Sequence, residues 1–227
     1  MGITWDAHED TLKFTGLKGD PDTTKRKILS QAFSVWGLDL RGLLLPFSIR
    51  SKIILQNLYR MKYGWDDELK EADLREWCEW CKDAEELDEV KIPRALLNCD
   101  KVIRETTLYV FCDARQNAYG ACAYLRREFE EEELECRLVA GKGRVAPLKA
   151  QSICRLELMG ALIVARLAET LVAEMMTKIE KVVFWCDYKV FVGNRVSEIH
   201  TIKSDLEATL GAGTGELEIR TVGVRSG

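Results

Sequence analysis

The sequence predicts a mixed fold (α+β or α/β): a small β-hairpin and a helical segment, followed by a mixed β-sheet with flanking helices. Two observations carry this prediction. Apolar residues recur at helical spacing through most of 1–100, and after Pro93 they alternate or run continuously, as in strands. The later order, β-β-β-α-β-α-β, is typical of a sheet with helices on its faces. The change of pattern predicts two domains, 1–100 and 101–227.

The N-terminal part contains one predicted hairpin, in which Ile3 and Trp5 alternate with polar neighbours. Three helices follow, each with an apolar stripe on one face, and the second begins at a proline that suits a first helical turn. The hairpin covers 2–15, and the helices cover 24–36, 46–63 and 67–87.

The C-terminal part begins with three predicted strands, which are joined by short polar turns. A long amphipathic helix, a strand, a second helix and a last strand complete the order. The strands cover 106–113, 118–127, 134–140, 181–187 and 216–222, and the helices cover 153–177 and 190–204.

Composition excludes several classes of protein. The chain has 227 residues, 47% of them hydrophobic, which is enough for a buried core, and its net charge of −4 provides no global attraction for nucleic acid. Neither a signal peptide nor a membrane-spanning run is visible, so we expect an intracellular protein with no membrane partner. Four of the eight cysteines fall within apolar patterns, which predicts reduced core residues: Cys112, Cys122, Cys154 and Cys186.

Three acidic residues stand where structural elements are expected to begin or end. Asp113 and Asp187 each close an apolar run, and Glu157 lies near the start of the predicted helix 153–177. Carboxylates are the ligands that Mg²⁺ prefers, and two divalent ions held together can activate water for phosphodiester hydrolysis. Each acid alone has a simpler explanation, as a turn residue or as a first-turn helix acid favoured by the helix dipole. The three together indicate a divalent metal site.

Several sequence stretches resemble the ribonuclease H region of BEL/Pao retrotransposon Pol polyproteins. The stretches around the acids are Phe111-Cys112-Asp113-Ala114, Arg144-Val145-Ala146-Pro147-Leu148-Lys149 and Arg155-Leu156-Glu157-Leu158. The resemblance extends upstream through Gly2-Ile3-Thr4-Trp5-Asp6 and Gly64-Trp65-Asp66-Asp67, and downstream through 191–199. It therefore covers most of the chain.

The resemblance implies an RNase H-like fold and the hydrolysis of RNA in RNA/DNA hybrids. Asp113, Glu157 and Asp187 would be the catalytic, metal-binding carboxylates, with Mg²⁺ or Mn²⁺ in a two-metal site. The domain 1–100 would be the end of the reverse transcriptase palm with thumb and connection helices. The rest of the Pol polyprotein would be a partner, and the location would be cytoplasmic, nuclear or within a virus-like particle. The sequence predicts no oligomeric state.

The resemblance also implies a nucleic-acid interface of basic residues. Lys25, Arg26 and Lys27 would lie near the backbone of a template–primer, although a solvated helix face explains them equally well. Near the cleavage site, the residues that would meet the hybrid are Arg144, Lys149 and Arg155. Contacts of this kind position a substrate without reading its sequence.

The chain departs from the family in ways that leave its activity open. It contains no Tyr-x-Asp-Asp stretch, which excludes a polymerase centre in these residues, and neither Asp-Thr-Gly nor Asp-Ser-Gly, which excludes an aspartic protease. The family's final Asn-Pro-Ala-Asp and a helix-length segment after Asp187 are absent, so we expect an incomplete sheet covering. The alternatives are an inactive fragment that at most binds nucleic acid, and an interaction domain repurposed by a host.

Overall fold

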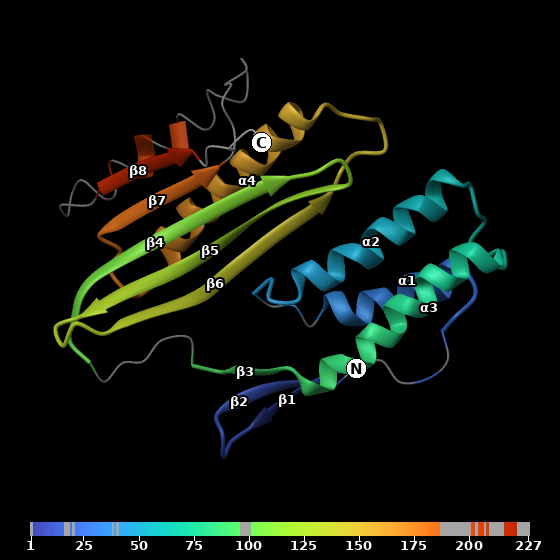
Figure 1. Cartoon of the computed structure of the whole chain (residues 1–227), viewed down its shortest axis with the longest axis horizontal. Coiled ribbons are helices and arrows are strands. Elements are labelled where there is room, and N and C mark those ends of the chain that lie inside the picture. Colours follow the sequence, from blue (N-terminus) through green and yellow to red (C-terminus); the bar gives the residue numbers. More distant parts are fainter. Residues whose placement is uncertain are drawn as a thin grey trace, which may run out of the picture. The chain divides into compact units, whose positions relative to one another are not determined.

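The computed structural model describes residues 2–15, 19, 21–37, 39, 41–95, 101–186, 201–202, 204–206, 208 and 216–221. The chain forms two compact units, Met1–Leu97 and Asn98–Gly227 (Figure 1). No helix in the described ranges is long and apolar enough to cross a membrane.

The first unit opens with the predicted hairpin, formed by β1 (Gly2–Asp6) and β2 (Thr11–Thr15). A third antiparallel strand, β3 (Lys91–Pro93), pairs with β2 and gives the sheet order β1-β2-β3. The sequence did not predict β3, because a three-residue strand that ends in proline carries no alternation of its own. Pairing with β2, far away in the sequence, is what makes it a strand.

Three helices pack together in this unit: α1 (Lys25–Trp36), α2 (Leu45–Arg60) and α3 (Glu71–Glu85). A 3₁₀ turn, η1, continues α3 over Glu86–Glu89. Trp77 and Trp80 are fully buried, with their rings stacked at 4.8 Å, and Phe47 stacks on Trp80 at the same distance. The three predicted helices are therefore confirmed, and large aromatic side chains fill the space between them.

The second unit is a five-stranded mixed sheet with the order β6-β5-β4-β7-β8 (Figure 1). Its first three strands form an antiparallel meander, whereas the last two run parallel to the central strand. The strands are β4 (Ile103–Ala114), β5 (Ala118–Phe129), β6 (Leu134–Val145), β7 (Lys181–Cys186) and β8 (Glu216–Thr221). The predicted mixed sheet is confirmed.

One long helix, α4 (Ile153–Glu174), covers a face of this sheet (Figure 1). Ser152 begins it as the N-cap, and its side chain accepts a hydrogen bond from the Arg155 amide, which satisfies one of the unpaired amides of the first turn. The helix ends at Glu174, because Met175 is extended (φ −75°, ψ 130°). Buried Leu156 and Ile163 fix the face that it turns toward the strands.

One expectation about the fold was wrong, and another falls mostly outside the described residues. Cys154 was expected in the core but is exposed, because it lies on the solvent side of the first turn of α4. Most of the predicted helix 190–204 lies outside the described residues, although 201–202 and 204–206 are helical. The seven cysteines in the described ranges are all free, which agrees with the expectation of reduced thiols.

Candidate active site

Asp113 lies at the end of the central strand β4, next to a turn. The Ala114 backbone N–H donates a hydrogen bond to Asp113 Oδ1 at 2.8 Å, and Arg115 Nε lies 4.0 Å from Oδ2. The Asp113 side chain is 75% exposed. Its carboxylate is therefore accessible and only weakly engaged, which suits a group that binds an external ligand.

Glu157 comes from the second turn of α4, and packing of this helix brings it to the same end of the sheet. A Cβ atom at Gly160 would lie 3.6 Å from Cys112 Cβ and 3.7 Å from the Asp113 carbonyl oxygen, so the helix here touches the end of β4. Glu157 precedes Gly160 by three residues, which is nearly one helical turn and places both on the same face. The Glu157 side chain is half-buried.

Asp187 lies outside the described residues, but the strand before it is described. β7 runs parallel to β4, with Phe111 opposite Trp185 and their rings 6.2 Å apart. A hydrogen bond to Cys186 and burial both raise the pKa of the Cys112 thiol above its ordinary value. The last described residue of β7 therefore lies beside the residue before Asp113. Among the described residues, no group of three or more His, Cys, Asp or Glu could hold a metal ion.

Two glycines flank Asp113 across the sheet. Gly120 on β5 lies opposite Asp113, and Gly143 on β6 lies opposite Gly120. A Cβ atom at Gly120 would lie only 2.9 Å from the Lys142 carbonyl oxygen. Glycine is needed there because the backbone of β6 approaches closely.

Replacing Gly120 with alanine should lower the free energy of unfolding by about 1–3 kcal/mol, because the new methyl group must push two paired backbones apart. Chemical denaturation measures this change. The matched control is Gly160→Ala, where the nearest atom to the new Cβ lies 3.6 Å away, an ordinary contact. In a helix, alanine should maintain or increase stability by up to about 1 kcal/mol. Equal stability of the two variants would contradict this account of Gly120.

The basic residues predicted in the first unit contact other protein groups. Lys25 is only 5% exposed, and its ammonium donates to the Tyr63 carbonyl and lies 4.3 Å and 4.8 Å from the ring centroids of Tyr59 and Trp65. Arg26 pairs with Asp66 at 2.8 Å, and Lys27 pairs with Asp22 at 3.5 Å. Burial leaves the Lys25 ammonium little room for a phosphate, whereas the exposed pairs of Arg26 and Lys27 could exchange partners.

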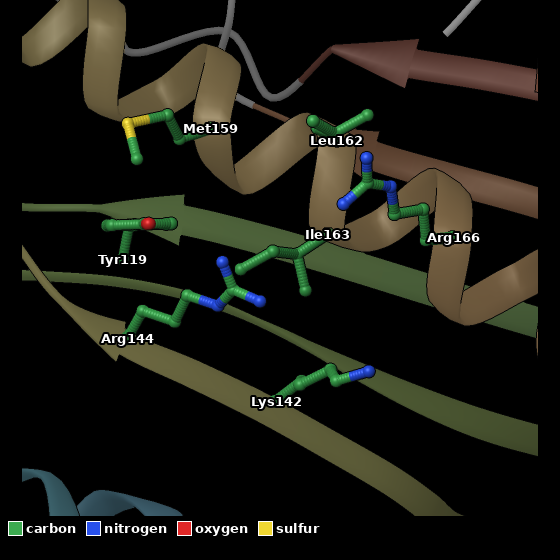
Figure 2. Close-up of a pocket in the computed structure, with 7 residues that line it drawn as sticks. All are labelled: Tyr119, Lys142, Arg144, Met159, Leu162, Ile163 and Arg166. Atoms are coloured by element: carbon green, nitrogen blue, oxygen red, sulfur yellow. The ribbon is translucent and has the colours of Figure 1, made fainter. Parts of the chain in front are cut away.

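The basic residues predicted in the second unit are exposed: Arg144 on β6, Lys149 in the following loop and Arg155 on the first turn of α4. Arg144 also lines a pocket of about 90 Å³ with two cations that the sequence analysis missed, Lys142 on β6 and Arg166 on α4 (Figure 2). The spacing of two between Lys142 and Arg144 was a usable signal, because it places both side chains on one face of a strand. No local signal connects either of them to Arg166.

Comparison with known families identifies the chain. The sequence model of the Pao retrotransposon-like RNaseH-like domain matches residues 24–188, which is most of the chain. The chain belongs to this family. A search of curated proteins finds no match.

Solved structures that resemble this Pao-family chain include RNases H, at low identity. RNase H1 from Halobacterium salinarum NRC-1 is 12% identical, covering 53% of this chain and 86% of that one, with a TM-score of 0.28. The N-terminal RNase H domain of a Mycobacterium tuberculosis protein is 9% identical, covering 53% and 83%, with a TM-score of 0.31. LC11-RNase H1, solved with an RNA/DNA hybrid, is 9% identical, covering 53% and 86%, with a TM-score of 0.27.

Proposed function

We propose that this chain is the RNase H-like part of a Pao-type Pol polyprotein and that it hydrolyses the RNA strand of RNA/DNA hybrids with divalent metal ions. The observation that carries the proposal is the contact between the second turn of α4 and the end of β4. This contact brings Glu157 to the strand end that bears Asp113, with the end of β7 beside it. Membership of the Pao family supports the same reaction.

The donor set fits a hard divalent cation. Asp113 and Glu157 would hold it, and Asp187, which follows Cys186 directly in the sequence, is the third proposed ligand. Bound Mg²⁺ or Mn²⁺, in a two-metal arrangement, supplies an activated water and stabilises charge on the leaving oxygen. The exposure of Asp113 and the glycines opposite it leave space for a substrate beside the carboxylates.

The remaining work of the protein is to position the hybrid. Exposed Arg144, Lys149 and Arg155 are proposed to contact its phosphates near the site, and such contacts fix register without reading bases. The first unit is proposed to correspond to the palm end and the thumb and connection helices. Of its three predicted contacts, Arg26 and Lys27 remain in the proposed interface. Lys25 does not, because its ammonium is buried.

The test is cleavage of a labelled RNA/DNA hybrid by the purified chain in Mg²⁺, in Mn²⁺ and in EDTA. We expect cleavage with either metal, none in EDTA, and recovery when Mg²⁺ is added in excess of EDTA. An Asp113→Asn preparation, purified in parallel, measures contaminating nuclease. Cleavage that persists in EDTA or equals that of the Asp113→Asn preparation would overturn the proposal. A folded protein that binds hybrid without cutting would favour the alternative, an inactive Pol fragment that binds nucleic acid.

A further inference from the structure

The pocket that contains Arg144 is built by the pairing of β5 with β6. Tyr119 lies opposite Arg144, and Ala121 lies opposite Lys142, so both cations share a sheet face with two buried residues. This is the face that α4 covers. Figure 2 shows Lys142 and Arg144 on the strand and Arg166 on the helix, with the guanidinium groups of the two arginines turned toward Ile163 between them.

The floor of the pocket is apolar, and its rim is cationic. Met159, Leu162 and Ile163 from α4 line it together with Tyr119 from β5. Of these, Leu162, Ile163 and Tyr119 are buried. Water competes less strongly for a charge beside such surfaces than for one in open solvent, so an anion held there interacts more strongly with the cations. The arrangement suits a small anion better than an apolar ligand.

Lys142 and Arg144 differ from the other cations on these strands. Arg126, Arg127 and Arg137 each pair with a glutamate of β5 or β6. Lys142 and Arg144 form no ion pair with any residue in the described ranges. Two neighbouring cations without an acidic partner leave positive charge for an anion from outside the chain.

The size of the pocket limits its occupant. Its volume is about 90 Å³. Pockets for whole small molecules usually measure about 300–1,000 Å³. The pocket therefore suits one phosphate group whose remaining structure lies outside it.

The position of the pocket indicates where that phosphate comes from. The row Ala114–Tyr119–Arg144 crosses the sheet next to the row that contains Asp113. Strands lie about 4.8 Å apart, so β6 is about 10 Å from β4. Successive phosphates advance by about 3.4 Å along the axis of a duplex. Because residues of adjacent rows point to opposite faces of the sheet, the side chains of Arg144 and Asp113 lie further apart than their strands. A hybrid cut at Asp113 would present phosphates over such a distance within several nucleotides of the cleaved bond.

We propose that Lys142, Arg144 and Arg166 form a phosphate-binding pocket for the backbone of the hybrid, separate from the carboxylates. The inference rests on the proposed function, because it takes the hybrid as the ligand. The contact is independent of sequence, since phosphates carry no base information. Lys142 and Arg166 become positioning residues, which hold the duplex while the carboxylates act.

The experiment compares Lys142→Gln/Arg166→Gln with the wild-type chain in hybrid binding, measured in EDTA at a series of salt concentrations. Each phosphate contact contributes about 0.9 to the slope of log K against log salt, so we expect the slope to fall by about 1–2 and the affinity at low salt to fall about tenfold or more. Arg104→Gln/Lys178→Gln is the matched control. It removes the same charge from exposed positions at the opposite end of β4 and β7, and should leave the slope unchanged.

Each outcome decides the inference. A slope that falls only in Lys142→Gln/Arg166→Gln supports the pocket, whereas an equal fall in the control variant or no fall in either overturns it. Absence of any hybrid binding by the wild-type chain overturns it too. Inorganic phosphate tests the free anion as the ligand, by its effect on the melting temperature of the wild type relative to chloride at equal ionic strength. If phosphate raises the melting temperature but the slope for hybrid binding is unchanged in Lys142→Gln/Arg166→Gln, the pocket binds free phosphate and not the backbone. Hybrid binding is measured in EDTA, so this measurement does not depend on cleavage. If Lys142→Gln/Arg166→Gln lowers the slope but the wild-type chain never cuts the hybrid, only the proposed catalysis is contradicted.

Discussion

Replacing Glu157 with glutamine is expected to lower metal-dependent cleavage of an RNA/DNA hybrid by about 1,000-fold while leaving the melting temperature close to that of the wild type. The change removes one negative charge from the proposed metal site and retains nearly the same side-chain shape. A metal ion supplies several kcal/mol of transition-state stabilisation, and about 4 kcal/mol corresponds to a factor of about 1,000 in rate. Single-turnover cleavage in Mg²⁺ measures this loss directly.

The matched control is Glu169→Gln, the same substitution at an exposed position on the same helix. It should leave the rate within about twofold of the wild type, since surface substitutions rarely change more than a few tenths of a kcal/mol. Excess Mn²⁺ provides a second readout, because weakened metal binding shifts the concentration of metal that gives half-maximal rate. A Glu157→Gln variant that cuts as fast as Glu169→Gln would remove Glu157 from the site.

Combining Glu157→Gln with Asp113→Asn tests whether the two carboxylates act as one unit. Residues that share a ligand are strongly non-additive, so the double variant should be about as slow as the slower single variant. Multiplied effects would indicate independent roles, contrary to a shared metal site. The contact between α4 and β4 at Gly160 is the structural reason to expect coupling.

The sheet was largely predictable because its strands carry their own pattern, but their ends were not. Strand 106–113 was expected from an apolar run, and β4 extends over Ile103–Ala114. Strand 134–140 was expected to stop before the glycines at 141 and 143, and β6 continues to Val145. Glycine is unfavourable in strands in general. Here, however, β5 and β6 approach so closely at Gly120 that a side chain would collide with the neighbouring backbone.

Lys25 shows why the basic residues were harder to predict than the acids. In the sequence it begins a run of three cations on a helix, which is compatible with a phosphate contact. Its environment comes from Tyr59, Tyr63 and Trp65, which lie far along the chain and enclose the ammonium. Arg166 was missed for the same reason, because only packing of α4 brings it to β6. Asp113 and Glu157, by contrast, were marked by their positions at element ends.

We expect the largest loss of stability when a buried ion pair is broken between Arg127 on β5 and Glu135 on β6. Arg127 is 2% exposed, and its Nε donates to Glu135 Oε2 at 3.1 Å, while Arg137 Nε donates to Oε1 at 3.2 Å. Glu135→Gln would leave the Arg127 guanidinium buried without a full counter-charge. We expect the free energy of unfolding to fall by about 3–5 kcal/mol, measured by chemical denaturation.

Glu128→Gln is the matched control for Glu135→Gln. Its partner Arg126 and its own side chain are 29% and 25% exposed, so water compensates for the lost pair and the expected cost is about 1 kcal/mol or less. The variant Arg127→Met/Glu135→Leu replaces both charges by apolar groups, and it should recover most of the stability lost in Glu135→Gln. If stability did not recover, the ion pair would contribute more to stability than the cost of burying its two charges.

The pH dependence separates the charge of Glu135 from its shape. Burial raises the pKa of Glu135, but hydrogen bonds from Arg127 and Arg137 outweigh burial, so its pKa in the folded state lies below the ordinary 4.5. A lowered folded pKa means that the stabilisation is complete above the pKa of the unfolded chain and is lost as the pH falls through the folded value. The stability difference between wild type and Glu135→Gln should therefore be constant near neutral pH and shrink below about pH 4.5. A difference that stayed constant through that range would assign the effect to packing of the side chain and not to its charge.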